Sequence, residues 1–503
     1  MQNRAGRLIL NSIYSVLAWS LPVALGLLVT PYLLKTLGVE AYGVYLVILG
    51  LIGYSFTFNL SKAVAKFVAE YGVTGETRKI NSAITAAFLL SLAFGILGSI
   101  VIGLLSEWAV TDLLQITPEL QRSARIALMI GGASIPFFLI GLVFQNILQG
   151  SHRFGALSFI VNLNWVLLSG GNVILVYLGA GIDSLLIWTV VAACVTAIIS
   201  YIAARRAEPE YRLAFRDAGE MVRPVASYGS SIFLYQFFGS VMLVFERAWL
   251  TRSFGAETAA YYLVPMGLVF YFHAFMSNLT AAIFPVLNEL LADRERLLEL
   301  YKKSTKLLVS LTVLFLLSTI AGGHSFLKLW IDPLFADSSS PLLVIHAITF
   351  GLIVVMMAVW QVNEVFHAAR VNSLVAGIWA VITITLMMLA ADRWNAEGIA
   401  LSRTIGVAVT LPAIALIERR FFGAVQWRFW LQLITKIGAA ACVLGMIDYL
   451  VFFSTEPGWL GLVIGLGAGA LGYAATLYFT GFVSPDERAA LLQVFGIGRQ
   501  SVQ

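Results

Sequence analysis

The sequence predicts an all-α integral membrane protein of about 14 transmembrane helices, arranged as two six-helix lobes followed by two additional helices. Three observations predict this fold class. Hydrophobic residues make up 59% of the 503 residues and charged residues only 12%, about half the charged fraction of a soluble domain. The apolar residues fall into runs of about 20, the length that crosses a bilayer. A stretch that begins near Gly38 recurs near Gly255, which indicates a duplicated bundle.

Each apolar run is expected to be one helix, because a segment in lipid must satisfy its own backbone hydrogen bonds. The strands of a membrane barrel would instead alternate in polarity over about ten residues. The first run follows Arg4 and Arg7 and is too long for a cleaved secretory signal. The fourteen expected spans are 11–34, 41–61, 82–105, 124–148, 156–178, 182–203, 225–250, 259–285, 305–322, 341–362, 372–391, 398–417, 429–452 and 459–482.

Basic residues between the spans predict the orientation of the chain. With the N-terminus inside, 23 of the 32 lysines and arginines fall on the inner side and seven on the outer side. The bias stays in phase to the end, which favours an even number of spans and two cytoplasmic termini. We expect Lys436 and Asp448, which lie within the thirteenth span, to snorkel to the surface or to be paired.

The segments between the spans predict the domain organisation. The longest, such as 62–81 and 204–224, are too short to fold as separate domains. We expect a first lobe over 1–203, a cytoplasmic linker over 204–224, a second lobe over 225–420 and two further helices over 421–503. The arginine-rich linker is either a hinge between the lobes or an ordinary solvated loop.

An internal repeat supports the two lobes. At an offset of 217 residues, ten of the 31 positions from 35 to 65 are identical, among them the pairs Gly38 and Gly255, and Tyr45 and Tyr262. The offset places the first helix on the seventh, an even shift, so the two copies run parallel. Parallel repeats related by an axis along the membrane normal are a transporter architecture, with the substrate path between the two bundles.

Polar residues near the end of the second span suggest a ligand site. Ser55, Asn59, Lys62 and Lys66 are spaced by four, three and four residues, which places them on one helical face. Two cations and two hydrogen-bonding groups suit a phosphate or sugar ligand. Alternatively the lysines snorkel to water, the interpretation that we favour for Lys66 but not for Lys62.

Further candidates for the substrate path lie on other predicted helices. Small polar residues also serve helix packing in lipid, and the charged pair could instead lie at the outer interface. These candidates are Asn11, Ser15, Tyr235, Gln236, Glu246, Arg247 and Asn278.

The sequence contains no pattern typical of an enzyme. It has no glycine-rich phosphate loop followed by Lys-Ser or Lys-Thr, and its five histidines and two cysteines lack metal-ligand spacing. We therefore expect no catalytic residues, no metal and no cofactor. The basic residues are dispersed between apolar runs, so no nucleic-acid partner is expected.

Several motifs resemble one known family when they are taken in their order. Thr30-Pro31 and Leu37-Gly38-x-Glu40-x-Tyr42-Gly43 are similar to the first signature of the polysaccharide transport family. Phe58-Asn59-Leu60-Ser61 resembles its next motif, with Asn in place of Asp and Ser in place of Gly, so this motif carries no carboxylate here. Further matches are Phe284-Pro285, Leu329-Trp330-Ile331 and Gly398-Ile399-Ala400.

That family contains the Wzx-type O-antigen flippases and belongs to a superfamily with the lipid II flippases and the multidrug MATE exporters. The resemblance implies two six-helix lobes around a central cavity lined mainly by helices 1, 2, 7 and 8. It also implies alternating access that moves an undecaprenyl-diphosphate-linked glycan outward across the bacterial cytoplasmic membrane. The implied partners are the lipid-linked glycan, membrane lipid, and the glycan polymerase and export machinery.

Three alternatives remain open at this point. A MATE-like exporter of cationic drugs would need acidic residues deep in its cavity. A membrane glycan polymerase or ligase would need a sizeable outer loop with catalytic arginines or carboxylates. A membrane scaffold would lack a large water-accessible cavity.

The predicted orientation can be tested directly. A reporter enzyme that is active only in the cytoplasm should be active when it is fused after Gln503, because the charge bias places both termini inside. The control is a reporter that is active only outside the membrane, fused at the same position. Activity of the outer reporter alone would contradict both the orientation and the even number of spans.

Overall fold

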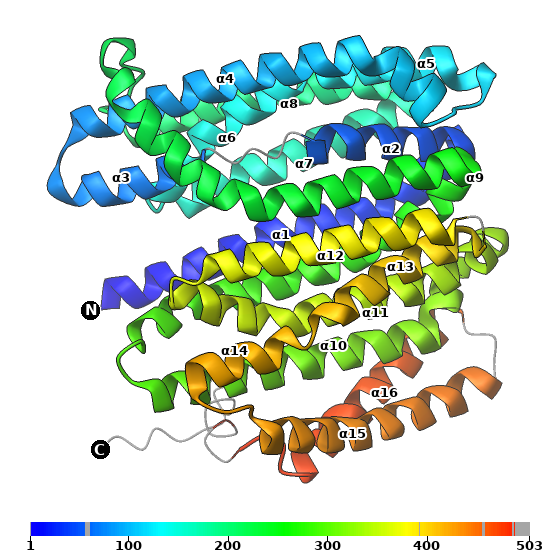
Figure 1. Cartoon of the computed structure of the whole chain (residues 1–503). Helices are drawn as coiled ribbons and strands as arrows, with labels where there is room; N and C mark the ends of the chain where they lie inside the picture. The colour runs from blue at the N-terminus through cyan, green and yellow to red at the C-terminus, as the bar shows by residue number, and fades with distance from the viewer. Residues whose placement is uncertain (1, 56–60, 392, 455–457, 485–486, 488–503) are drawn as a thin grey trace. The chain divides into compact units, whose positions relative to one another are not determined.

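The computed structural model describes residues 2–55, 61–391, 393–454, 458–484 and 487, and their side chains except at 2–19, 55, 229–235, 282, 285, 369 and 453–454. Helices make up nearly all of this part of the chain, and it contains no strand (Figure 1). A short π-helical turn (Ala109–Leu113) and a 3-10 turn (Phe215–Asp217) interrupt the series. The helices are α1 (Gln2–Leu37), α2 (Val39–Ser55), α3 (Lys62–Thr74), α4 (Thr77–Trp108), α5 (Pro118–Gly132), α6 (Ile135–Gly150), α7 (Phe154–Tyr177), α8 (Ile182–Ala207), α9 (Gly219–Glu289), α10 (Arg294–Trp330), α11 (Pro333–Val365), α12 (Ala369–Ala390), α13 (Asn395–Thr410), α14 (Ala413–Phe422), α15 (Trp427–Ser454) and α16 (Trp459–Phe479).

The helices confirm an all-α membrane protein with about fourteen spans. Twelve of the described segments are long and apolar enough to cross a membrane. One of these, Gln236–Glu289, has 54 residues and breaks at Gly255, where φ is 82°, so it holds two spans. A further apolar helix, Val39–Tyr54, is shorter.

The segments that we expected to be long loops are mostly helical. Residues 62–81 form α3 and the start of α4, and only 290–293 separate α9 from α10. Hydropathy marks only the apolar part of a helix, whereas backbone hydrogen bonds continue into its polar ends. At 37 residues, α10 is ~55 Å long, well beyond the ~30 Å hydrocarbon core.

Side-chain burial distinguishes peripheral helices from central ones. In α4 only 17% of the apolar window is buried, and Leu104 on this helix is 79% exposed. A surface of this kind requires lipid, because water would penalise so much exposed apolar area. In α11, by contrast, 72% of the window is buried, so this helix forms the interior of its bundle.

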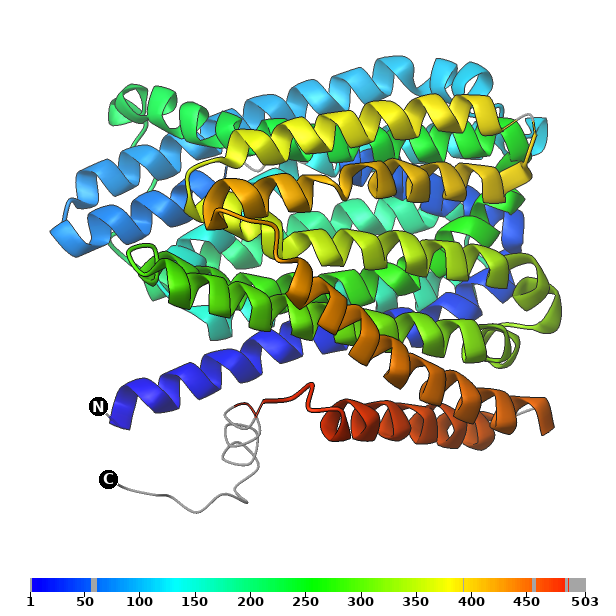
Figure 2. The ribbon, with the colours of Figure 1, turned by 60° about the horizontal axis from the view of Figure 1, so that its bottom comes forward.

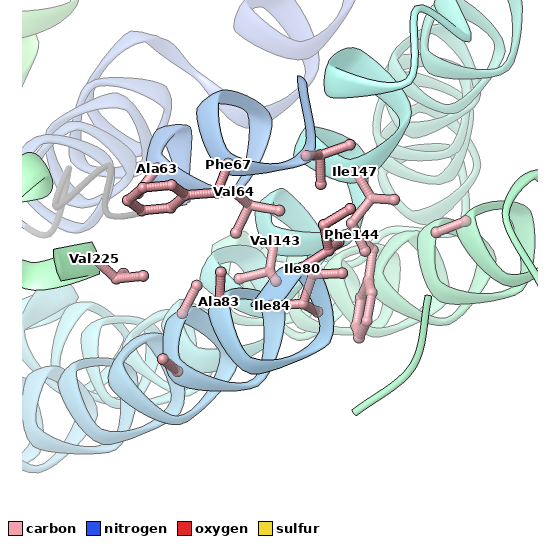
Figure 3. Packing of buried hydrophobic residues seen from close by; sticks show 14 of the residues in the cluster. Ala63, Val64, Phe67, Ile80, Ala83, Ile84, Val143, Phe144, Ile147 and Val225 are labelled. Atoms are coloured by element: carbon pink, nitrogen blue, oxygen red, sulfur yellow. The ribbon is translucent and has the colours of Figure 1, made fainter. Parts of the chain in front are cut away.

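The chain divides into two compact units. Unit 1 consists of Met1–Val264 and Ala376–Ser402, and unit 2 of Pro265–Val375 and Arg403–Gln503. One core of unit 1 lies where α3, α4 and α6 meet, and its members include Val64, Phe67, Ile84, Phe144 and Ile147. Figure 3 shows these apolar side chains gathered between the helices. The amphipathic helix α3 is therefore held by its apolar face.

The segment 204–224, which we expected to be a linker, is bound to the beginning of α4 in unit 1. Asn81 receives a hydrogen bond from the backbone N–H of Arg212 (2.8 Å), and Thr85 Oγ1 receives one from the N–H of Ala214 (2.7 Å). Arg78 forms an ion pair with Asp217 at 3.0 Å. These contacts fix the path of the chain from α8 into α9.

In unit 2, a buried carboxylate joins three helices. Glu418 of α14 is fully buried and accepts hydrogen bonds from Tyr301 Oη of α10 (2.8 Å), Trp430 Nε1 of α15 (2.9 Å) and the N–H of Gln426 (2.9 Å). Three donors compensate its desolvation.

The last two helices form a hairpin. α15 and α16 lie side by side (Figure 2), and both pack on α10. Tyr473 Oη of α16 donates to the carbonyl oxygen of Ser310 in α10 at 2.9 Å. The hairpin is thus attached to unit 2 by polar contacts as well as by its apolar core around Leu433, Leu444 and Leu477.

Two equivalent glycines of the sequence repeat both have a positive φ. Gly38, between α1 and α2, has a φ of 85°, and Gly255, the break in α9, has a φ of 82°. Glycine adopts this left-handed conformation without steric cost. Position 43 is equivalent to position 260, and a Cβ at Gly43 would lie 3.3 Å from the Ala260 nitrogen. Contact between equivalent positions is what a twofold relation between two copies produces.

Gly43 should be essential for this helix contact. A Cβ there would lie 1.9 Å from the Ala256 carbonyl oxygen, whereas a Cβ at Gly53 on the same helix meets nothing within 4 Å. We expect Gly43→Ala to lower the free energy of unfolding by ~1–3 kcal/mol, because backbone cannot yield as a side chain does. Reversible denaturation in detergent would measure this change. Gly53→Ala is the matched control, and equal stability of the two variants would contradict the contact.

Candidate functional site

Two adjacent charged residues of α9 are buried in unit 1. Glu246 is 0% exposed and Arg247 is 7% exposed. Because adjacent residues on a helix point in different directions, they meet different neighbours. Charges inside a membrane protein are costly and are usually functional. Burial removes the alternative that they are solvated residues at a helix end.

Glu246 has a partner within α9 itself. The hydroxyl of Tyr262 lies beyond the break at Gly255 and donates to Glu246 Oε1 at 2.5 Å. Tyr262 is also fully buried. A short hydrogen bond to a carboxylate is among the stronger neutral-to-charged contacts. This bond connects the two segments of α9 across the break.

Arg247 points toward α2. Its guanidinium carbon lies 4.6 Å from the centre of the Tyr54 ring, and its Nη1 donates to the Leu243 carbonyl oxygen at 3.2 Å. Space for it comes from Gly50, where a Cβ would lie 2.1 Å from the arginine Nε. In the described part of the chain no carboxylate forms an ion pair with Arg247, and its buried Nε has no hydrogen-bond partner.

Polar side chains continue along the same face of α9. Gln236, Ser240 and Arg247 are separated by four and seven residues, which is close to one and two helical turns. The distance along the axis from Gln236 to Arg247 is ~16 Å. Gln236 is partly buried, and its Oε1 has no hydrogen-bond partner among the described residues. This face therefore offers both a cation and amide and hydroxyl groups.

The two lysines of the predicted stripe both lie on α3, and both are exposed. Lys66 Nζ lies 3.9 Å from Glu70 Oε2 and 4.7 Å from the centre of the Tyr228 ring in α9. Lys62 begins α3 and, within the described residues, takes part in no hydrogen bond or ion pair. Lys62 is thus the more available of the two cations.

The described part of the structure does not bring the other predicted residues together with Gln236, Glu246 and Arg247. The structure describes the backbone but not the side chains of Asn11 and Ser15 on α1, Ser55 at the end of α2 and Tyr235 on α9. Asn59 lies outside the described residues. Asn278 belongs to unit 2 and is exposed on the second segment of α9. Their place in the site stays a prediction.

Three contacts of this group were not predicted as functional. All three belong to the identities of the internal repeat, in which Gly50 aligns with Gly267, Tyr54 with Tyr271 and Tyr45 with Tyr262. A signal was therefore present, but the repeat does not say which identities touch a charge. In unit 2, Arg403 of α13 is 2% exposed, and its guanidinium lies 4.7 Å from the centre of the Phe350 ring. Each unit thus holds one arginine buried against an aromatic ring.

A cavity of about 350 Å³ also lies within unit 1. Apolar side chains of α2, α6, α7 and α8 make up most of its wall, and Gln145, Asn164 and Thr196 add polar groups. Thr196 donates to Asn164 at 2.9 Å, so those two groups are already satisfied. No cluster of three or more potential metal ligands occurs among the described residues.

Comparison with known proteins places these features in a family. Sequences described as "Polysaccharide biosynthesis protein" match residues 71–330, more than half of the chain. The chain belongs to this family. A Shigella flexneri protein provisionally named an O-antigen transporter is 20% identical over 407 residues, which are 80% of this chain and 95% of that relative.

Solved structures show the fold of this family member. The lipid II flippase MurJ in its inward closed conformation matches with a TM-score of 0.69 at 14% identity, over 94% of this chain and 99% of that one. An inward-facing MATE family multidrug resistance transporter of the MOP superfamily matches with a TM-score of 0.68 at 15% identity, over 81% and 94%. The polysaccharide biosynthesis family member is thus a multi-pass membrane protein with the fold of MOP transporters.

The packing of Arg247 can be tested by a double-mutant cycle. We expect Gly50→Ala to destabilise the protein, because the new methyl group would occupy the space of the arginine side chain. In the Arg247→Ala background the same substitution should cost little. The coupling should be ~1–3 kcal/mol, measured as the free energy of unfolding in detergent. Additive effects of the two substitutions would show that the side chains do not meet.

Proposed function

We propose that this protein is a flippase that moves a polyprenyl-diphosphate-linked oligosaccharide from the inner to the outer leaflet of the bacterial cytoplasmic membrane. Alternating access of the two lobes, 1–203 and 225–420, would carry the head group across. The product would serve the synthesis of a cell-surface polysaccharide. Membership in the polysaccharide biosynthesis family and the MOP transporter fold support this proposal.

The observation that carries the proposal is that Arg247 is buried without an acidic partner among the described residues. A guanidinium that is 7% exposed and has no carboxylate in ion-pair distance among the described residues is costly in lipid. An anionic ligand would remove that cost. A diphosphate suits the planar fork of arginine, which binds two oxygens at once.

The neighbouring groups fit the rest of such a ligand. Gln236 and Ser240 lie on the face of α9 that carries Arg247, and amides and hydroxyls bind sugar hydroxyl groups. Lys62 on α3 offers a second, more accessible cation for the first encounter with the diphosphate. Lys66, which is close to Glu70, would contribute less.

The proposal also states how the protein is oriented in the membrane and which proteins receive its product. Both termini would lie in the cytoplasm, as the distribution of lysine and arginine predicts. The glycan polymerase and export machinery would receive the translocated glycan. In this proposal the protein itself breaks no covalent bond and needs no cofactor.

The MATE-like alternative uses the same fold with opposite charge requirements. A cationic drug needs an available buried carboxylate. In unit 1 the buried carboxylate Glu246 already accepts a hydrogen bond from Tyr262, whereas Arg247 has no acidic partner in the described part of the chain. The charges of unit 1 therefore favour an anionic substrate.

The proposal predicts that charge, rather than shape, matters at Arg247 and Lys62. We expect Arg247→Gln and Lys62→Ala each to weaken export, since a charge-assisted contact is worth ~1.5–3 kcal/mol, or roughly ten- to hundredfold in affinity. Arg247→Lys and Lys62→Arg should retain more activity than the neutral variants. The measurement is glycan export in a flippase-deficient strain, with protein levels checked by immunoblot.

Arg122 of α5 provides the matched control. It is exposed and forms no ion pair among the described residues, so Arg122→Gln should export normally. Full export by Arg247→Gln would exclude Arg247 from substrate binding. Full export by Lys62→Ala would mean that Lys62 only reaches toward water. Loss of drug resistance with intact glycan export would favour the MATE-like alternative.

A further inference from the structure

One buried carboxylate of the C-terminal hairpin, α15 and α16, receives no hydrogen bond from the described residues. Asp448 of α15 is 1% exposed, and neither of its carboxyl oxygens has a hydrogen-bond partner in the described part of the chain. The expectation that it snorkels or is paired was therefore wrong. The other intramembrane candidate, Lys436, does find a partner, because its Nζ donates to the Gly481 carbonyl oxygen at 2.9 Å.

Asp448 lies beside the middle of α16, the last apolar helix long enough to cross a membrane. A Cβ at Gly469 of α16 would lie 2.3 Å from Asp448 Oδ1, so the carboxyl group lies against the α16 backbone at that residue. α16 has 21 residues, and Gly469 is the eleventh of them. It is thus ~15 Å from either end of the helix, half the thickness of the hydrocarbon core.

Among the described residues, no cation faces Asp448 from α16 or α10. α16 contains no charged residue, and its titratable residues are Tyr473, bonded to Ser310, and Tyr478. On α10, Ser310 lies at the level of Tyr473 and Gly322 at the level of Leu462, and no titratable residue occurs between them.

On α15 itself, the neighbouring titratable residues are also unsuited to compensate the carboxylate. Tyr449 is 62% exposed, Cys442 is exposed, and Lys436 lies three turns away with its amine on Gly481. Leu444 occupies the previous turn. The surroundings of Asp448 are therefore apolar side chains and helix backbone.

A second carboxylate of unit 2 shows how burial of such a group can be compensated by hydrogen bonds. Glu418 is equally buried but receives three hydrogen bonds, from Tyr301, Trp430 and the Gln426 N–H. Asp448 receives none from the described residues. An ionised carboxylate without donors is strongly disfavoured in a medium of low dielectric, whereas the neutral acid is tolerated.

We propose that Asp448 is a proton-binding site at the centre of the membrane, which holds its proton while α15 and α16 are packed together. Release of the proton would place a bare charge against the backbone at Gly469. The two helices would then have to separate, so that water or lipid head groups reach the carboxylate. The hairpin is thereby closed by a proton, independently of how the protein moves its substrate.

Infrared spectroscopy of the purified full-length protein tests the protonation state regardless of access to the site. We expect the carbonyl band of a buried carboxylic acid near neutral pH in the wild type, and we expect it to be absent in Asp448→Asn. Glu418→Gln should leave this band unchanged, because three hydrogen-bond donors already compensate the Glu418 carboxylate. Absence of the band from the wild type would overturn the proposal.

The pH dependence of unfolding provides a second measurement. The stabilising contribution of a proton held in the folded state is present at low pH and is lost as the pH rises. Wild-type protein should therefore lose stability with rising pH relative to Asp448→Asn, a neutral side chain of the same shape. Parallel pH profiles would overturn the proposal, as would loss of the acid band on addition of sodium, which would assign a metal cation instead.

Discussion

A charge that is enclosed by helices in a hydrocarbon medium must be compensated, and this requirement shapes the interior of the protein. The compensation takes several forms. Glu418 receives three hydrogen bonds and thereby ties α14 to α10 and α15. Glu246 receives one from Tyr262 and thereby connects the two segments of α9. Arg247 and Arg403 lie against aromatic rings, which compensate a buried cation only in part. Each contact fixes helices as well as a charge.

The internal repeat shows how a duplicated backbone acquires different chemistry. Gly38 and Gly255 both have a positive φ, so this turn of the backbone occurs in both copies. The equivalent tyrosines differ in their hydrogen bonds: Tyr45 receives one from Asn172, whereas Tyr262 donates one to Glu246. At the position equivalent to Arg247, the first copy has Thr30. The copies therefore differ in their side-chain chemistry at equivalent positions.

The sequence alone predicted the spans well, because lipid imposes one length and one type of secondary structure on every segment that crosses it. It failed at α3, since an amphipathic helix with several charges has low hydropathy even when its apolar face is packed. It also failed at Asp448. Whether a charged residue snorkels or is enclosed depends on which side of a helix meets a neighbour, and a single sequence does not contain that information.

For the same reason, the sequence could indicate Arg247 as a candidate but not its surroundings. Gly50 and Tyr54 lie on α2, almost 200 positions earlier in the chain, and only the packing of α9 shows that they receive the arginine. Their repeat identity was visible in the sequence. Yet a Cβ at Gly267, the equivalent of Gly50, would meet no atom within 4 Å, so this second glycine makes room for no side chain.

The manner in which Arg247 is held bears on its suitability for a ligand. A cation–π contact engages the face of the guanidinium and leaves the N–H groups at its edge available. Of the five donors, the described residues engage one, through the Leu243 carbonyl oxygen. If the protein is the flippase proposed above, a diphosphate would bind without displacing Tyr54, and the arginine would need little reorganisation, which favours affinity. Lys66 offers no such arrangement, because Glu70 already lies beside its amine. Arg247 is therefore better suited than Lys66 to bind an anion in the proposed function, because its N–H donors are not already engaged by a carboxylate.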